Sequence, residues 1–163
     1  MATRLVHKMT YEASAIEVAG MLSDPVFRET VCRNQRATSY TVEIEGNVDA
    51  KAVRIEMAQP TDRVPAFAKK IVGDSTTIVQ TETWSSPLRA TVTIVIPGKP
   101  GDIQGTVTLV EVDGVTTETV DLEIKVKIPL VAAKIEELLA KLLGSAMRAE
   151  ERTGKEWLGS ESR

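Results

Sequence analysis

Val115-Thr-Thr-Glu-Thr-Val-Asp-Leu-Glu-Ile-Lys-Val-Lys-Ile128 continues directly into Pro129-Leu-Val-Ala-Ala-Lys-Ile-Glu-Glu-Leu-Leu-Ala-Lys-Leu-Leu143, and the hydrophobic period changes between the two segments. In the first segment apolar and polar residues alternate, as in a strand with one buried face; the apolar ones are Val120, Leu122, Ile124, Val126 and Ile128. In the second segment they recur at helical spacing, at Val131, Ile135, Leu138, Leu139, Leu142 and Leu143. The sequence therefore predicts a half-buried strand followed by a long amphipathic helix that extends to Leu158.

Upstream of this segment, period-two alternation reaches back to Thr38 and predicts three hairpins. They pair residues 40–44 with 53–57, 76–84 with 89–96, and 103–112 with 115–128. The last hairpin turns at Asp113-Gly114, which is the strongest short-range hairpin signal in a sequence. Thr and Val dominate these segments, which favours a sheet with one face in water.

The N-terminal part predicts one strand and two short helices. The strand, about residues 4–11, directs Leu5, His7, Met9 and Tyr11 to the core. Ser14 and Glu17 have the spacing of a capping box, so a helix should begin there. We expect it to bury Ile16, Val18, Ala19 and Leu22. Asp24-Pro25 then suits the start of a second helix that runs to Asn34.

One further helix interrupts the hairpins. Pro65 can open it and Gly73 can close it, which predicts about two turns over residues 65–72. Phe67 and Ile71 then lie on one face of this helix. At the other end of the chain, residues 159–163 are expected to fray.

The order of elements predicts an α+β fold in one domain over residues 1–163. An antiparallel sheet with one apolar face needs a cover. A final helix of about 29 residues would be roughly 43 Å long and could cross the whole sheet, which must then curl around it. The predicted order is strand, helix, helix, six antiparallel strands and a long C-terminal helix.

With this order of elements the chain resembles the START-like, or helix-grip, superfamily, which includes polyketide cyclases, the birch pollen allergen and lipid-transfer domains. The resemblance covers essentially the full length. More narrowly, four motifs are similar to an actinobacterial domain family of unknown function. These motifs are Asp24-Pro25-x-Phe27, Val64-Pro65-Ala-Phe67-Ala-Lys-Lys-Ile-Val-Gly73, Gln80-Thr-Glu-Thr-Trp84 and Lys125-Val-Lys-Ile-Pro-Leu-Val131.

The resemblance implies a cavity between the curved sheet and the last helix, used for sterols, lipids, polyketides or other apolar small molecules. The residues are compatible with such a cavity, because mostly aliphatic side chains fill the space under a curved sheet poorly; a fully packed core is the alternative. Phe67 and Ile71 would form either a lid over the cavity or a small satellite core. The ligand-binding residues we predict are His7, Met9, Tyr11, Tyr40, Phe67, Ile71, Trp84, Val131, Ile135, Leu138, Leu139 and Leu142.

Two residues are candidates for acid or base chemistry. His7, the only histidine, could serve as a base or a donor, although we expect a hydrogen-bonded core residue. Glu82 shares a strand face with Gln80 and Trp84. If it faces inward, it is a carboxylate with a raised pKa and the best acid/base candidate. We expect it to face outward, because charged residues are rarely buried without a partner.

Other residues have both a structural and a functional interpretation. Trp84 is more often core than ligand platform, and the hydroxyls of Tyr11 and Tyr40 reach either a ligand or water. Gly144 lies inside the last helix at a cost of about 1 kcal/mol relative to Ala. A kink, the close approach of a ligand or simple tolerance would each explain it.

Composition excludes several classes of function. A net charge of -3 with both signs interspersed leaves no basic field for nucleic acid. No His, Cys and carboxylate cluster has metal-ligand spacing and no glycine-rich phosphate loop follows a strand, so we expect no metal and no cofactor. The single Cys32 is not placed for nucleophilic catalysis and forms no internal disulfide. Without a signal-peptide pattern or a membrane span, we expect a cytoplasmic protein, a monomer or weak homodimer.

The function we predict is the binding, carriage or sequestration of an apolar small molecule, without catalysis. The first alternative is an enzyme of cyclase or dehydratase type in which His7, Glu82 or a tyrosine handles protons. It requires at least two of these groups to converge on one pocket. The second alternative is a protein-interaction module, which would expose a contiguous apolar patch.

Overall fold

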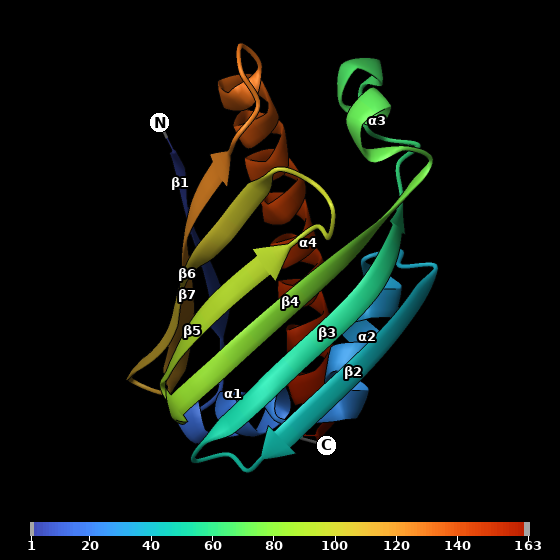
Figure 1. Cartoon of the computed structure of the whole chain (residues 1–163). Coiled ribbons are helices and arrows are strands. Elements are labelled where there is room, and N and C mark those ends of the chain that lie inside the picture. Colours follow the sequence, from blue (N-terminus) through green and yellow to red (C-terminus); the bar gives the residue numbers. More distant parts are fainter. Residues whose placement is uncertain (1, 162–163) are drawn as a thin grey trace.

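A long C-terminal helix lies against the concave face of an antiparallel sheet in the computed structural model, which describes residues 2–161 (Figure 1). The elements follow in the predicted order. They are β1 (Thr3–Tyr11), α1 (Ala15–Leu22), α2 (Pro25–Asn34), β2 (Ser39–Gly46), β3 (Lys51–Pro60), α3 (Ala66–Val72), β4 (Ser75–Ser86), β5 (Arg89–Val95), β6 (Gly101–Val112), β7 (Val115–Val126) and α4 (Ala132–Glu161). The predicted α+β helix-grip architecture is confirmed.

The sheet has seven strands in the order β1-β7-β6-β5-β4-β3-β2, so the first strand pairs with the last. The register places Met9 of β1 opposite Glu118 of β7, and Leu109 of β6 opposite the same glutamate. Residues directly opposite each other share a face, so these three side chains point to the same interior. All three are buried.

Gly105 of β6 allows two strands to approach closely where the sheet curls. A Cβ atom at this position would lie 1.8 Å from the carbonyl oxygen of Asp121 and 2.9 Å from the Cα of Leu122 on β7. No side chain fits there, so only glycine is compatible with this backbone approach.

The helix signals are confirmed, with a correction in α1. Ser14 and Glu17 form the capping box, and Asp24 caps α2 with Pro25 in its first turn. Ile16 is 64% exposed, so the expectation that it is buried is wrong. The first residue after the cap is Ala15, and it is Ala15, Val18, Ala19 and Leu22 that complete the inner face.

The ends of α4 differ from the expected ones. The helix begins at Ala132, because Leu130 adopts a φ of 73° and residues 129–131 form a turn. Val131 therefore precedes the helix and does not belong to its apolar stripe. At its other end α4 continues to Glu161, three residues beyond Leu158; residues 162–163 of the expected tail lie outside the described part.

The core has two halves along α4. In one half α1, α2 and the C-terminal part of α4 cover the sheet, and the rings of Phe27 and Trp157 meet edge to face at 5.5 Å. In the other half only the N-terminal part of α4 and the projecting α3 lie near the sheet (Figure 1). These two halves hold different kinds of site.

Candidate functional site

A buried salt bridge joins α2 to the middle of the sheet. Arg28 Nη1 donates to Glu82 Oε2 at 2.9 Å and Nη2 to Oε1 at 2.8 Å, and each side chain is 4% exposed. Arg28 Nε donates to the carbonyl of Leu22 at 2.8 Å. Gln80 and Trp84, on the same face of β4 as Glu82, donate to its two oxygens at 2.7 and 2.8 Å.

These contacts overturn the expectation for Glu82. Its side chain faces inward, because Arg28 supplies the partner that a buried charge requires. Burial alone would raise the pKa of Glu82, but the charge of Arg28 and the hydrogen bonds from Arg28, Trp84 and Gln80 together hold that pKa below its usual value. The alternative that Glu82 faces inward is therefore correct, but the raised pKa that we attached to it is wrong.

Two further carboxyl groups, those of Glu118 and Glu150, lie in the same half of the core as the Arg28–Glu82 salt bridge. Glu118 of β7 is 3% exposed, and its Oε1 atom has no hydrogen-bond partner among residues 2–161. Burial, and then the charge of Glu150 on α4, raise the pKa of Glu118 well above its usual value. Burial also raises the pKa of Glu150 to about 7. The pKa of each of these two carboxyl groups therefore lies above its usual value, and burial is the main cause for both.

Two more polar side chains border this region. Lys51 of β3 is 4% exposed, and its Nζ lies 4.3 Å from the centre of the Trp84 ring. Burial, and then the charge of Arg28, lower the pKa of Lys51 to about 8. Tyr11 is fully buried, and burial together with the charge of Glu118 raises its pKa. The interior of this half is thus an ionic cluster made of Arg28, Lys51, Glu82, Glu118 and Glu150.

An apolar pocket of about 60 Å³ lies in the other half of the core. It is bordered by α3, the C-terminal ends of β5 and β7, the N-terminal end of β6 and the first turns of α4. This volume has room for a few waters and is well below the roughly 300–1,000 Å³ of a typical small-molecule site. Its lining consists of Ile71, Val72, Ile94, Ile96, Lys99, Pro100, Gly101, Asp102, Ile103, Ile124, Lys125, Val126, Ile128, Ile135 and Leu139.

Three of the predicted ligand-binding residues, Ile71, Ile135 and Leu139, line this pocket. Leu138 is half-buried outside the lining, and Leu142 is 39% exposed. The last part of the predicted stripe therefore turns away from the pocket, because a stripe read at fixed spacing drifts around a long helix.

The segment from Thr61 to Asp74, which carries α3, closes one side of the pocket. Its two ends are tied together, since the backbone N–H of Thr61 donates to the carbonyl of Asp74 at 3.2 Å. Phe67 does not line the pocket; the Nζ of Lys134 on α4 lies 4.3 Å from the centre of its ring. This cation–π contact connects α3 to the first turn of α4.

The remaining predicted residues lie away from the pocket. Met9, Tyr11 and Trp84 are buried in the half that holds the ionic cluster. Tyr40 is half-buried, and its hydroxyl accepts a hydrogen bond from Arg33 Nη1 at 2.9 Å. His7 is also half-buried, and its Nε2 has no partner within the described residues, so the expected core hydrogen bond at that nitrogen is absent.

Sequence patterns did not identify Arg28, Lys51, Glu118 or Glu150 as site residues. A signal was present for three of them. Glu118 and Lys51 each occupy a position that alternation assigns to the buried face of their strand. Arg28 precedes the buried Val31 and Cys32 by three and four residues, so it lies on the same face of α2 as they do. Their charge suggested exposure, and only their partners in space reverse that expectation.

Two absences hold for the part of the chain that the structure describes. No group of three His, Cys, Asp or Glu side chains there is arranged to hold a metal ion. No helix of residues 2–161 is long and apolar enough to span a bilayer.

Comparisons with known proteins identify both family and fold. Residues 6–158 match the model of the family described as "Protein of unknown function (DUF2505)". No curated protein matches the sequence. Among solved structures, the protein TTHA0849 from Thermus thermophilus is similar with a TM-score of 0.69 and 14% identity over 99% of this chain and 100% of that one.

Two further structures share the fold. A START superfamily protein from Mycobacterium smegmatis has a TM-score of 0.62 and 15% identity over 95% of this chain and 98% of its own. The di-domain ARO/CYC StfQ from the steffimycin biosynthetic pathway has a TM-score of 0.67 and 9% identity over 99% of this chain and 52% of its own. The protein therefore belongs to the DUF2505 family of unknown function, and its fold is that of the START-like, helix-grip superfamily.

Proposed function

We propose that this protein binds and carries an apolar small molecule, lipid or polyketide-like, between the sheet, α3 and the N-terminal part of α4. The observation that carries the proposal is the pocket itself, whose lining is mostly Ile, Val and Leu with a few polar groups at its rim. Such a lining is typical of small-molecule sites. The structural neighbours named START superfamily protein and ARO/CYC support the same class of function.

The small volume of the pocket means that a ligand must displace α3. Ile71 and Val72 of α3 contribute directly to the lining, so an outward movement of this helix enlarges the pocket. The segment is suited to such a movement because its ends are tied at Thr61 and Asp74 and it projects from the sheet (Figure 1). Burial of ligand surface, at about 25 cal/mol per Å², would offset the packing that α3 gives up when it moves.

A carrier is favoured over an enzyme by the state of the acid/base candidates. Glu82 is fully engaged by Arg28, Gln80 and Trp84, and its lowered pKa makes it a poor proton donor. His7 does not line the pocket, and neither do Tyr11 and Tyr40. The single buried thiol of Cys32 is compatible with the cytoplasm as the site of this function.

Binding of cis-parinaric acid, a fluorescent fatty acid, tests the proposal. Leu139→Trp fills the pocket and should weaken binding at least several-fold without loss of the folded state, as judged by the thermal midpoint. Leu142→Trp is the matched control, since Leu142 is exposed one turn further along the same helix. The control should bind as wild type does.

Native mass spectrometry of protein purified from its own host provides a second readout. It should detect a bound apolar molecule that the Leu139→Trp variant no longer retains. If wild type carries no such molecule and both tryptophan variants bind the probe equally, the pocket is not a ligand site.

A further inference from the structure

The end of the molecule that contains the pocket has a charge opposite to that of the whole chain. We call it the pocket end and define it as residues 61–74, 96–103 and 125–134. It contains three acidic residues and seven basic ones, a net charge of +4, whereas the whole chain carries -3. The basic residues are Arg63, Lys69, Lys70, Lys99, Lys125, Lys127 and Lys134.

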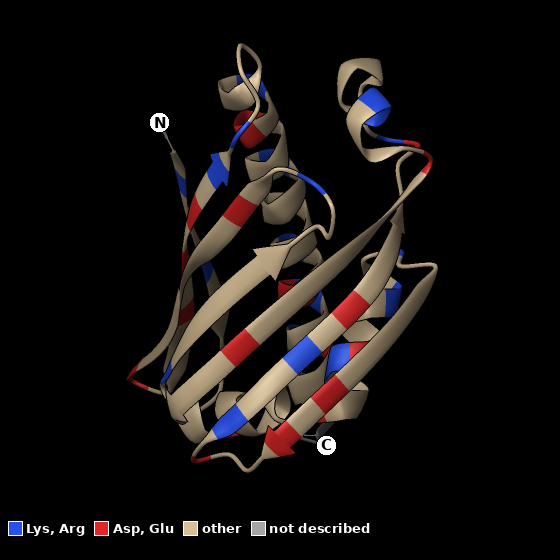
Figure 2. Cartoon of the chain, in the orientation of Figure 1, with Lys and Arg blue, Asp and Glu red and all other residues tan. Residues whose placement is uncertain are grey.

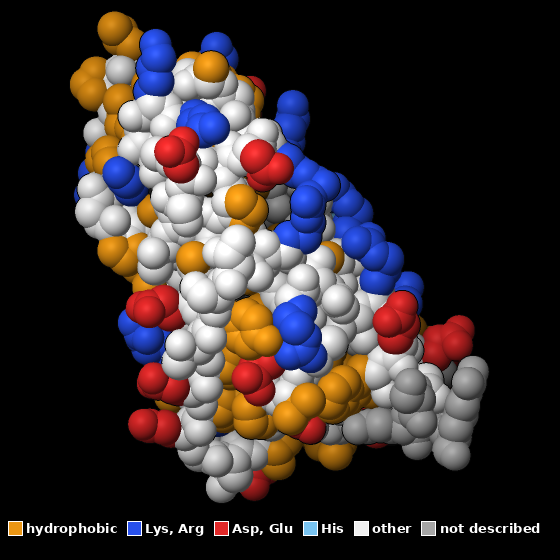
Figure 3. All heavy atoms as spheres, turned by 90° about the vertical axis from the view of Figure 1, so that its right-hand side faces the viewer, with side chains coloured by type: hydrophobic (Ala, Val, Ile, Leu, Met, Phe, Trp, Pro, Cys, Tyr) orange, Lys and Arg blue, Asp and Glu red, His pale blue; other side chains and the backbone are white. Residues whose placement is uncertain are grey.

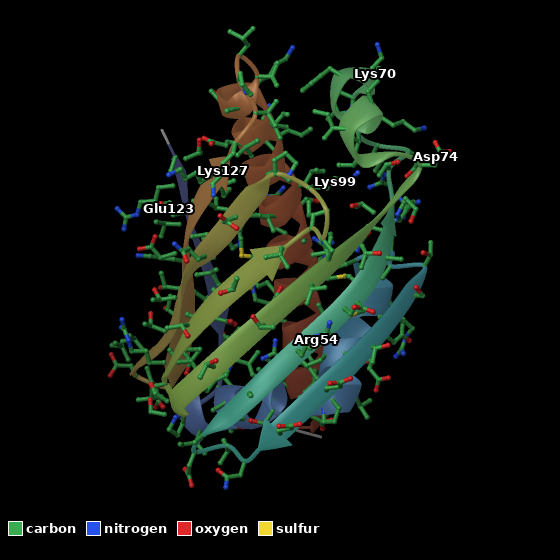
Figure 4. The ribbon with its side chains drawn as sticks, in the orientation of Figure 1. Arg54, Lys70, Asp74, Lys99, Glu123 and Lys127 are labelled. Atoms are coloured by element: carbon green, nitrogen blue, oxygen red, sulfur yellow. The ribbon has the colours of Figure 1, made fainter. Side chains whose placement is uncertain are left out.

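The lysines of the pocket end come from separate segments of the chain and lie toward one end of the molecule. Figure 4 places Lys70 of α3, Lys99 of the loop after β5 and Lys127 after β7 toward the same end of the molecule. In Figure 2, where the ribbon is coloured by residue type, basic segments lie on α3, in the loop after β5 and at the end of β7. Lys99, Lys125 and Asp102 contribute to the pocket lining, so the charged residues that border the pocket carry a net positive charge.

Few of these charges are neutralised within the described residues. Lys127 lies 3.5 Å from Asp102 and Lys69 3.7 Å from Asp74, and both are surface pairs with little net stabilising effect. Lys70, Lys99 and Lys125 form no ion pair with any residue in 2–161. The positive field at the pocket end is therefore free to attract an anionic partner.

Leu130 is the exposed apolar residue of the turn between Lys127 and Lys134. It is 104% exposed, whereas the next most exposed large hydrophobic side chains in the described chain reach 64%. Its φ of 73° is a conformation that L-residues other than Asn and Asp rarely adopt, and it turns the chain between Lys127 and Lys134. A lone exposed leucine is ordinary on a protein surface, but this one stands among lysines and two residues after Ile128 of the pocket lining.

We propose that the pocket end docks on an anionic lipid bilayer, with Leu130 inserted among the headgroups and the lysines held over the charged surface. Stable binding to a bilayer surface takes two signals, an apolar insertion and a basic patch, and the pocket end has both. A protein partner would need a contiguous apolar core in the interface, and here one protruding leucine stands in a polar rim.

The geometry also connects docking to the pocket. The side of the pocket formed by α3, Lys99 and Lys125 belongs to the surface that faces the bilayer in this orientation. An apolar molecule then passes between bilayer and pocket without crossing water. Docking goes beyond ligand binding, and vesicle association is measured without any ligand transfer, so the two proposals fail independently.

Vesicle flotation of the full chain tests the docking surface. Wild type should bind vesicles of phosphatidylcholine mixed with phosphatidylglycerol, should bind phosphatidylcholine vesicles much more weakly, and should be released by salt. The double variant Lys125→Gln, Lys127→Gln should weaken vesicle binding about 25-fold, because each lysine near the surface contributes about fivefold to the binding constant. Leu130→Ser should weaken it further, while Ile16→Ser, which removes another well-exposed apolar side chain, from α1, should have no effect.

A second basic surface provides the charge-matched control. Figure 3 shows basic side chains along one flank of the molecule. Lys141 and Arg148 are exposed on α4, seven residues apart and so on one side of the helix. Lys141→Gln with Arg148→Gln removes the same charge and should leave binding nearly unchanged. Equal losses in the two double variants, or no binding of wild type to the anionic vesicles, would overturn the proposal.

Discussion

Arg28 of α2 and Glu82 of β4 form a bidentate salt bridge in the interior, with both side chains 4% exposed. Removing one partner leaves the other as an uncompensated buried charge, so Arg28→Met or Glu82→Gln should each lower the free energy of unfolding by roughly 3–5 kcal/mol. Urea titration measures this change.

The double variant separates the cost of an unpaired charge from the value of the pair. Arg28→Met combined with Glu82→Leu replaces both ions by apolar groups of similar size, and it should recover most of the stability lost by either single change. A double variant that remains as unstable as the single variants would show that the intact ion pair stabilises the fold relative to apolar groups.

The carboxyl pair Glu118 and Glu150 predicts a decline of stability from mildly acidic to neutral pH. Both pKa values are raised above the usual 4.5, that of Glu150 to about 7, so the folded state keeps protons that the unfolded chain has lost. The free energy of unfolding is then highest near the usual pKa and falls as pH rises toward 7. For Glu150 alone the fall is on the order of 3 kcal/mol.

Urea titrations at several values between about pH 5 and 8 measure this decline. Glu150→Gln keeps the shape of the side chain and removes its charge, so the decline should become shallower, and the part due to the burial of Glu118 should remain. Glu82 acts in the opposite sense, since its lowered pKa stabilises the fold above the usual value and loses that effect only in more acidic solution. Wild-type stability that rises through the same range would contradict the assignment.

Gly154 and Gly144 of α4 should respond oppositely to alanine. A Cβ at Gly154 would lie 2.6 Å from Cε1 of the fully buried Tyr11, so Gly154→Ala should destabilise by about 1–3 kcal/mol. At Gly144 the nearest atom is Arg148 Nη1 at 3.5 Å, an ordinary contact. Gly144→Ala should therefore stabilise by up to about 1 kcal/mol through helix propensity, as thermal melts would show. A loss of stability there would point to a hidden constraint.

The contact between Lys134 and Phe67 should restrain α3. Lys134→Met removes the cation over the ring and should increase amide hydrogen exchange in residues 61–74 several-fold, because the contact contributes about 0.5–1 kcal/mol at an exposed site. Exchange in β4 beyond residue 78 should not change. Unchanged exchange in residues 61–74 would mean that other contacts hold the segment.

Much of the fold was predictable because its signals are local. Alternation in residues 115–126, the Asp113-Gly114 turn and the cap formed by Ser14 and Glu17 each depend on neighbours in the chain, and each is found as expected, although the strand ends two residues before the predicted Ile128. The pocket was predictable only in part. Ile71, Ile135 and Leu139 line it, whereas Leu142 on the same expected stripe does not.

The sequence by itself determined the order of elements, the alternation along the strands and the caps of α1 and α2, since these follow from period and from residues a few positions apart. Only the tertiary structure decided that Arg28 meets Glu82, that Glu118 is buried with a raised pKa, and that Lys99 and Lys125 border one pocket. The physical reason is that a charge is buried or exposed according to its partner in space, and partners 54 residues apart, such as Arg28 and Glu82, leave no mark in a local pattern.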